Sequence, residues 1–435
     1  MRARTRLLTF IVPLGIITGA CWGAWADDSR RGDDRDRPKG DEQLVLKKKI
    51  GVGSDSNGKP LTLGAFDISF VDPKIELYVL ADRTNASVDM FDSEAAEFIG
   101  RVGSLCPTGN PAPHFCFQGV VLVNGVANNN LSGPDGVVIV DHKEIWAGDG
   151  DSRVKVIDIA TKSFVTTIAT GGTTRVDEMA YDSRDHLLAA ANNAETPPFV
   201  TLFDTNAKTI KGKITFDGTN NTPPATDTGI EQPQWSPETG LFYVSVPDFT
   251  TDASGAGEGG VSVIDPVTMT VVRTLLVTNC NPAGLALGPR HQALIGCSGS
   301  FGTPKQTQSV IIDITSTSSA VDGAVVATVP IGGNDEVWFD KGTRHYFLAG
   351  RNNLLAGKAD PILGSIDAKT NKLDPSAPTS TTAHSVAADA NAHNVFVPIG
   401  FVPANTDPTN PCPTTGCIAV FRARSEQSDE KVSER

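Results

Sequence analysis

The chain has 435 residues, of which 39% are hydrophobic and 20% charged, and its formal net charge is −13. This composition is typical of a folded globular protein and excludes a disordered or collagen-like chain. The acidic balance argues against nucleic acid as a partner, and 42 Gly and 28 Pro predict many turns.

The first 26 residues have the features of a secretory signal peptide. Three arginines within residues 2–6 precede an apolar run over residues 7–20, and residues 24–26 offer a small-residue cleavage site. The run is short for a transmembrane helix, which needs about 20 residues. Lipidation of Cys21 is the other alternative, but the residues before it do not match a lipidation motif. We expect cleavage after Ala26, a periplasmic or secreted protein, and no membrane span in the mature chain.

Both ends of the mature chain are strongly charged. Cleavage removes three Arg and no acid, which leaves 34 basic against 50 acidic residues. Residues 27–43 contain no apolar side chain to bury, and the tail over residues 425–435 has a similar composition. We therefore predict a disordered leader, a disordered tail, and one folded domain over residues 44–424.

Six cysteines remain after cleavage, and an even number suits disulfide bonding in an oxidising compartment. They fall into three local couples, separated by 10, 17 and 5 positions: Cys106–Cys116, Cys280–Cys297 and Cys412–Cys417. Zinc is the competing interpretation, but the couples do not repeat a C-x-x-C pattern. We predict these three disulfides, the second of them joining two paired strands of one hairpin.

One short segment recurs seven times, with apolar residues in alternation as in a half-buried strand. Its copies end at Asp92, Asp158, Asp204, Asp265, Asp313, Asp367 and Phe421. The intervals of 46 to 66 residues are near the period of four-stranded propeller blades with loop insertions. In six copies the closing Asp begins a turn, where its carboxylate can accept hydrogen bonds from the backbone N–H groups that follow.

A hairpin of two apolar strands precedes each copy, and a fourth strand follows most of them. The fourth strand of the sixth repeat, at residues 371–378, is poor, and the seventh repeat has none. An orphan strand at residues 44–52 can complete the last blade. The sequence therefore predicts an all-β, seven-bladed β-propeller of four-stranded antiparallel blades, whose ring is closed by the N-terminal strand. Two β-sandwich domains are the nearest alternative, but seven matched units argue against them.

The repeat is clearest in WAGDGDSRVKVIDIATKSFVTTIATGG, residues 146–172. This pattern resembles that of the exported YVTN-repeat (YncE-like) propellers, over about residues 44–424. The resemblance implies a periplasmic binding or scaffold protein. Its matched positions are strand and turn residues, so they specify the blade rather than the chemistry.

The first strand of each blade lines the central channel of a propeller, so polar residues at its start converge around one axis. These positions hold Asp67, Gly136 beside Asp135, Asp177 with Glu178, Glu231, Asn281, Asp335 with Glu336, and His384. Carboxylates that share one mouth must be hydrated, protonated with a raised pKa, or neutralised by a cation.

A calcium or magnesium ion would suit this oxygen-rich set. Its predicted ligands are Asp67, Asp177, Glu231, Asn281, Asp335 and His384. The alternative is that these side chains only make hydrogen bonds to turns and to the backbone.

A second polar group follows the second strand of each hairpin, at the same end of the channel. We predict ligand contacts there from Arg83, Asn85, Asn192, Arg351 and Asn352. An arginine above an acidic funnel can orient a ligand carboxylate through paired hydrogen bonds. Its alternative task is to balance the charge of the neighbouring acids.

The chain lacks the G-x-S-x-G, H-E-x-x-H, phosphate-loop and C-x-x-C-H motifs, which argues against a serine hydrolase, a zincin, a nucleotide cofactor and haem. We therefore expect a monomeric binding protein for a small molecule or a protein partner. The alternative is a metal-dependent lactonase like the gluconolactonase propellers. Its candidate metal ligands are Glu231, Asn281 and Asp335, and its candidate base is Asp177 or His384. Against this alternative, residues 65–67 read Ala-Phe-Asp where that family has a metal-binding Glu in a Glu-Gly-Pro turn.

Overall fold

The computed structural model of the chain describes residues 43–225, 229–248, 258–315, 324–402 and 406–424. The predicted signal peptide, the leader up to residue 42 and the predicted tail lie outside these ranges. Within them, no helix is long and apolar enough to cross a membrane.

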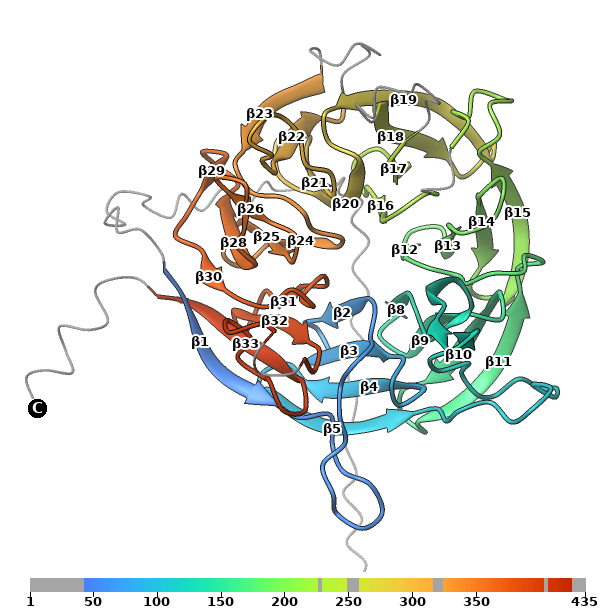
Figure 1. The fold of residues 1–435 in the computed structure, drawn as a ribbon. Helices are drawn as coiled ribbons and strands as arrows, with labels where there is room; N and C mark the ends of the chain where they lie inside the picture. The colour runs from blue at the N-terminus through green and yellow to red at the C-terminus, as the bar shows by residue number, and fades with distance from the viewer. Residues whose placement is uncertain (1–42, 226–228, 249–257, 316–323, 403–405, 425–435) are drawn as a thin grey trace, which may run out of the picture. The chain divides into compact units, whose positions relative to one another are not determined.

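Seven antiparallel sheets surround one central channel, which confirms the predicted seven-bladed β-propeller (Figure 1). Blade 1 consists of β2 (Ser69–Asp72), β3 (Leu77–Asp82), β4 (Ser87–Asp92) and β5 (Glu97–Val102). Blade 2 consists of β8 (Val137–Val140), β9 (Glu144–Asp149), β10 (Arg153–Asp158) and β11 (Ser163–Ala169). Blade 3 consists of β12 (Met179–Asp182), β13 (Leu187–Asn192), β14 (Phe199–Asp204) and β15 (Thr209–Thr215). Blade 4 consists of β16 (Pro233–Trp235), β17 (Phe242–Val246), β18 (Glu258–Asp265) and β19 (Thr270–Thr278). Blade 5 consists of β20 (Pro282–Leu287), β21 (Gln292–Cys297), β22 (Ser309–Asp313) and β23 (Val325–Val329).

Blades 6 and 7 depart from this regular order. Blade 6 consists of β24 (Val337–Asp340), β25 (His345–Gly350), β28 (Ile362–Asp367) and the two-residue outer strands β29 (Lys372–Leu373) and β30 (Ala377–Pro378), as the poor sequence of that fourth strand predicts. Blade 7 consists of β31 (Ala387–Asp389), β32 (Asn394–Ile399), β33 (Cys417–Arg424) and β1 (Gln43–Ile50). The N-terminal strand therefore closes the ring, as predicted.

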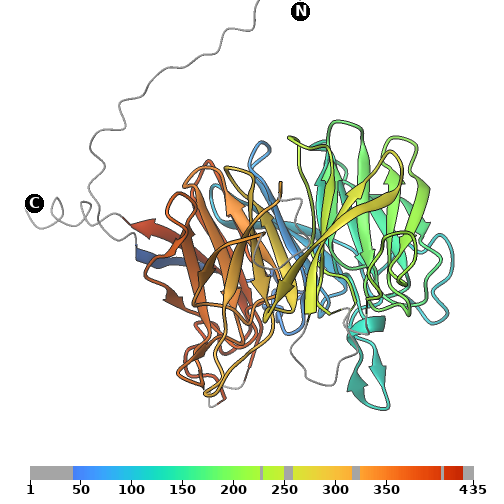
Figure 2. The ribbon, with the colours of Figure 1, turned by 90° about the horizontal axis from the view of Figure 1, so that it is seen from above.

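Two small hairpins lie outside the blades. They are β6 (Leu122–Val123) with β7 (Val126–Ala127), next to the 3-10 helix η1 (Asn129–Leu131), and β26 (Leu354–Leu355) with β27 (Lys358–Ala359). Figure 2 shows the β6–β7 hairpin projecting from one face of the ring.

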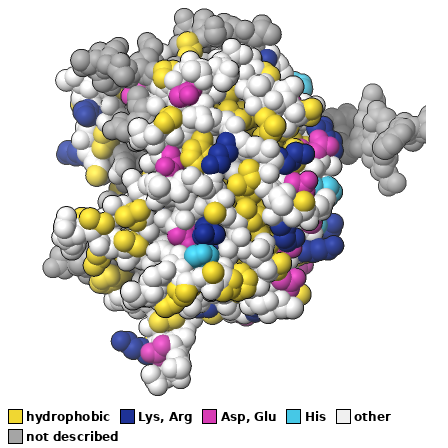
Figure 3. Space-filling view, turned by 90° about the vertical axis from the view of Figure 1, so that its right-hand side faces the viewer, with side chains coloured by type: hydrophobic (Ala, Val, Ile, Leu, Met, Phe, Trp, Pro, Cys, Tyr) yellow, Lys and Arg dark blue, Asp and Glu magenta, His cyan; other side chains and the backbone are white. Residues whose placement is uncertain are grey.

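The depth of each strand within its blade sets its burial. β3 is buried along its whole length, whereas exposed residues alternate along the outermost strand β5. Inner strands contact the neighbouring blades through both faces, so both sets of side chains are apolar. The outer side of the ring seen in Figure 3 carries basic and acidic side chains interspersed with scattered hydrophobic ones.

The hydrophobic core is divided into seven clusters, each between two adjacent blades. Between blades 7 and 1, for example, the rings of Tyr78 and Phe396 stack with their centroids 4.6 Å apart. The blades are therefore held by side-chain packing across their faces, and each face depends on the next blade for burial.

The predicted turns at the ends of the repeated segment are confirmed. In six blades Oδ1 of the closing Asp accepts a hydrogen bond from a backbone N–H two or three residues later: Asp92, Asp158, Asp204, Asp265, Asp313 and Asp367. Five of these blades also have a β-bulge in the pairing of this segment with the outermost strand. Bulges twist an outer strand and discourage its pairing with other chains.

All three predicted disulfides are present. The Cα atoms are 4.9 Å apart in Cys106–Cys116, 4.6 Å in Cys280–Cys297 and 5.7 Å in Cys412–Cys417. The second bond lies at the open end of the β20–β21 hairpin, where Cys297 pairs with Pro282. This bond therefore fixes the place at which the inner strand of blade 5 enters the channel.

Candidate functional site

A cavity of about 400 Å³, here called the charged pocket, lies at the end of the channel where the innermost strands begin. Its ionisable lining residues are Asp67, Arg83, Arg175, Asp177, Glu178, Glu231, Asp335, Arg351 and His384. The antiparallel blades explain this grouping, because each innermost strand starts at the same end of the ring. The structure thus brings together most of the side chains that the strand starts were predicted to supply.

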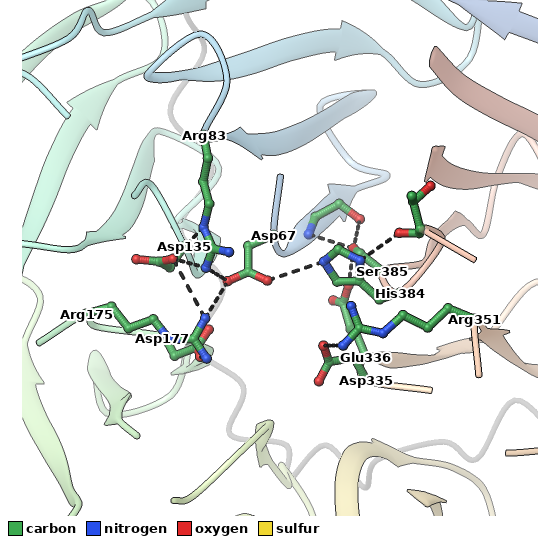
Figure 4. A network of polar contacts seen from close by, with 12 residues as sticks. Asp67, Arg83, Asp135, Arg175, Asp177, Asp335, Glu336, Arg351, His384 and Ser385 are labelled. Atoms are coloured by element: carbon green, nitrogen blue, oxygen red, sulfur yellow. Dashed lines mark hydrogen bonds and ion pairs between the residues drawn. The ribbon is translucent and has the colours of Figure 1, made fainter. Parts of the chain in front are cut away.

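Arg83 neutralises two of the carboxylates. Its Nε donates to Oδ1 of Asp135 at 2.9 Å, and its terminal nitrogen Nη2 contacts both Asp135 and Asp67 (Figure 4). The arginine is only 4% exposed. A buried guanidinium with two carboxylates is held by charge-assisted hydrogen bonds, so this part of the pocket is built by the protein itself.

Arg175 forms a second bridge, from blade 3 to blade 1. Its Nη2 lies 2.7 Å from Oδ2 of Asp177, its Nη1 lies 3.2 Å from Oδ2 of Asp67, and its Nε donates to Oδ1 of Asn193 at 3.2 Å. The Asn193 amide in turn donates to Asp177 at 2.6 Å. The sequence interpretation missed Arg175, which stands two residues before a channel carboxylate and outside the strand pattern.

His384 is held on three sides. Its ring stacks on Phe66 with the centroids 4.6 Å apart and the planes 8° from parallel. Its Nδ1 lies 2.8 Å from the carbonyl oxygen of Thr382, which can only accept, so Nδ1 carries a hydrogen. Its Nε2 lies 3.4 Å from Oδ1 of Asp67. This arrangement orients the imidazole edge toward the carboxylate network.

The other side of the pocket is more open. Arg351 Nη2 lies 3.3 Å from Asp335 Oδ2, and the two side chains are 36% and 27% exposed. Glu231 is half-buried, and its carboxyl group makes no hydrogen bond or ion pair with the described residues. These three side chains lie on the more exposed side of the pocket, where a ligand can contact them.

The carboxyl groups that line the pocket differ widely in pKa. Burial acts to raise the pKa of Asp67, but Arg83 and other cationic neighbours outweigh it and hold that pKa well below its usual range. Burial raises the pKa of Asp177 to about 7 against the opposing effect of Arg175. Burial and then the carboxylates of Asp177 and Asp335 raise the pKa of Glu231 well above its usual value. A cation that binds beside Glu231 would therefore displace a proton.

Other predicted site residues lie outside this lining. The Asn281 amide donates to the carbonyl of Pro247 at 3.3 Å, and the Asn85 amide donates to the carbonyl of Thr62 at 2.9 Å. Asn192 is buried, and its amide donates to Thr170 at 2.9 Å. Asn352 is absent from the lining as well. Of the three residues predicted as lactonase metal ligands, Glu231 and Asp335 line the charged pocket, whereas Asn281 is absent from the lining and bonds elsewhere.

The predicted cation site contains both carboxylates and guanidinium groups. Among the residues that the structure describes, no three His, Cys, Asp or Glu side chains are grouped so that they could hold a metal ion. The guanidinium groups of Arg83 and Arg175 stand between the carboxylates and neutralise part of their charge. Binding of a divalent cation stays a prediction.

Fold and pocket together define a seven-bladed β-propeller with a charged channel mouth. No family model and no curated protein matches the chain. Among solved structures it is similar to the hydrazine synthase of Kuenenia stuttgartiensis, with a TM-score of 0.57 and 14% identity over 77% of this chain and 92% of that one. It is also similar to a chain of the mitotic checkpoint complex, with a TM-score of 0.53 and 12% identity over 93% of this chain and 98% of that one. At these identities the likeness shows the fold alone.

Proposed function

We propose that this protein is an exported binding protein of the YVTN-repeat (YncE-like) type, which holds a small cationic ligand in the charged pocket. Three disulfides favour an oxidising compartment outside the cytoplasm. A propeller brings loops from seven blades to one end of a channel, which suits a binding role.

The imbalance of charge in the pocket carries this proposal. Five carboxyl groups line the pocket, against three guanidinium groups. Arg83 and Arg175 form ion pairs with Asp67, Asp135 and Asp177. Glu231 is left without an ion-pair partner among the described residues. An unpaired carboxylate among like charges is unfavourable, and a bound cation removes that cost.

The free groups suit an ammonium ligand better than a bare metal ion. Glu231 and Asp335 are two carboxylates, whereas calcium takes six to eight oxygen ligands and magnesium six, so a metal ion here would keep most of its water. An ammonium group needs only a few acceptors. Arg351 beside them can receive an anionic part of the same ligand.

Thermal unfolding and titration calorimetry test the proposal at constant ionic strength. The probes are putrescine as a diamine, calcium chloride and magnesium chloride, each compared with sodium chloride. Binding to the folded state alone should raise stability by about 2.7 kcal/mol at a hundredfold excess over the dissociation constant. Glu231→Gln should abolish that gain, whereas Glu94→Gln, which changes an exposed carboxylate outside the pocket, should keep it.

The outcome separates the ligand classes. A gain with putrescine that a chelator does not reverse supports an organic cation, and a gain with calcium or magnesium that a chelator reverses supports the divalent ion. No gain for the wild-type protein with any of the three probes would contradict the proposal.

A further inference from the structure

A second cavity, of about 620 Å³, lies at the opposite end of the channel from the charged pocket. It is lined by the later residues of the innermost strands and by the turns that follow them, and is here called the apolar pocket. Aromatic side chains form much of its wall: Phe70, Tyr181, Trp235, Trp338 and Phe339. Its volume lies in the range of about 300–1,000 Å³ that small-molecule sites occupy.

A layer of polar side chains separates the two pockets and ties neighbouring blades together. In this layer the residue just before an innermost strand accepts a hydrogen bond from a backbone N–H of the next blade. Ser385 Oγ accepts from Ser69 at 3.0 Å, Glu336 Oε2 from Val386 at 3.2 Å, and Gln232 Oε1 from Leu285 at 2.7 Å. Ser69 and Val386 occupy the same position of their blades, directly after the layer position, which holds Ile68 in blade 1 and Ser385 in blade 7.

Glu178 is the member of this layer in blade 3. In blade 4, the position that corresponds to the donors Ser69 and Val386 is Pro233. Proline has no N–H, so the bond that the other members receive is missing here. Both carboxyl oxygens of Glu178 are buried without a hydrogen-bond partner among the described residues, and the residue is 2% exposed. The preceding blade offers no side chain to help, because its layer residue is Gly136, where a Cβ would lie 2.0 Å from the carbonyl oxygen of Asp177.

Glu178 lines both cavities, so this residue lies at the inner end of the apolar pocket, where its carboxyl oxygens are buried. A buried unpartnered carboxyl group is costly, and native structures normally satisfy such groups. Nearby carboxylates, including Glu231 and Asp177, make the surroundings negative. A cation is therefore favoured at this point over an anion or a neutral group, and aromatic walls suit both an apolar body and a positive charge.

We infer that the apolar pocket binds an amphipathic amine, with its ammonium group on the Glu178 carboxylate and its apolar body among the aromatic side chains of Phe70, Trp235 and Trp338. The two pockets share Glu178, but the proposed ligand contact in the charged pocket is Glu231, so variants of these two residues test the two proposals separately.

Intrinsic fluorescence tests this inference, because Trp235 and Trp338 line the pocket. The probes are 2-phenylethylamine and its neutral isostere 2-phenylethanol, titrated into the full chain with emission excited from tryptophan. The wild-type protein should bind the amine at least tenfold more tightly than the alcohol. Glu178→Gln should remove this preference and leave binding of the alcohol within about twofold.

Two further variants guard against a folding defect. Pro233→Ala restores an N–H opposite Glu178 and is expected to weaken amine binding while it leaves the alcohol unchanged. Glu231→Gln removes one neighbouring carboxyl group but keeps Glu178, so a preference for the amine should remain. Equal affinity of the wild-type protein for both probes, or binding of neither, would overturn the inference and leave Glu178 satisfied by water alone.

Discussion

Arg175 and Asp67 meet across the channel although 108 residues separate them along the chain, and Nη1 of the arginine lies 3.2 Å from the carboxylate. The bond joins the segment that precedes blade 3 to the segment that precedes blade 1. The same guanidinium also holds Asp177. One arginine thus sets the shape of one side of the charged pocket, so its loss should affect both stability and binding.

We predict that Arg175→Met destabilises the protein by about 3–5 kcal/mol, because breaking a buried ion pair leaves its carboxylates uncompensated. Urea unfolding followed by circular dichroism measures the change. Arg184→Met is the matched control, since Arg184 is 52% exposed and pairs with Asp185 at the surface. A loss below about 1 kcal/mol for Arg175→Met would show that the network contributes little to folding.

Stability should fall as the pH rises above about 4.5. Burial raises the pKa of Glu336 from 4.5 to about 8, although Ser385 and Val386 donate hydrogen bonds that oppose it. In this window the folded state holds a proton that the unfolded chain releases, so the free energy of unfolding decreases with pH, by up to about 1.4 kcal/mol per pH unit. The contribution of Glu336 to the free energy of unfolding is fully present below pH 4.5 and is lost by about pH 8.

Glu336→Gln should flatten part of this pH dependence, and melting temperatures from pH 5 to pH 8 measure it. Asp177, whose pKa is raised to about 7, and Glu231, whose pKa is raised well above its usual value, contribute to the remaining slope. The exposed-site variant Glu94→Gln should follow the wild-type curve. Parallel curves for Glu336→Gln and the wild type would contradict the assignment.

Ring closure should be a large part of the stability. Ile50 of β1 is 7% exposed and pairs with Ile418 of β33. Ile50→Ala should cost about 2–5 kcal/mol, the usual range for a buried Ile→Ala change. Limited proteolysis should then cut near the first described strand before the rest of the ring. Lys47→Ala, at an exposed position of the same strand, should leave both measurements unchanged.

The Cys280–Cys297 disulfide closes a loop with a sequence separation of 17. Replacing both cysteines by alanine should destabilise the protein by about 3 kcal/mol, as expected for a loop of this length. Thermal unfolding under oxidising conditions measures the difference. Peptide mapping without reduction should recover this pair, and recovery of Cys280 joined to Cys106 or Cys412 would contradict the pairing.

The fold was largely predictable from the sequence, because its signals are local. A strand that alternates apolar residues and ends at an Asp turn is legible within one repeat, and seven copies fix the number of blades. The closing strand was predictable by elimination, since the last repeat lacks a fourth strand.

The site was only partly predictable, because it depends on where side chains point after closure. Asn281 stands at a strand start like Asp177, but it follows a disulfide-bonded cysteine and its amide bonds to Pro247. Arg175 lies outside the strand pattern, and its long side chain reaches the carboxylate of Asp67, 108 residues earlier in the chain. The isolation of Glu178 follows from Pro233, and this is visible only when neighbouring blades are placed in register.

The pairing of β1 with β33 ties the completion of the fold to the order of synthesis. β1 is made before every blade, and its partner is made after all of them, so the strand waits unpaired while the blades form in turn from the N-terminal side. During that time it offers an open edge to other chains. Any product that stops before β33 keeps this edge, so the junction has no unpaired strand only in chains that include β33.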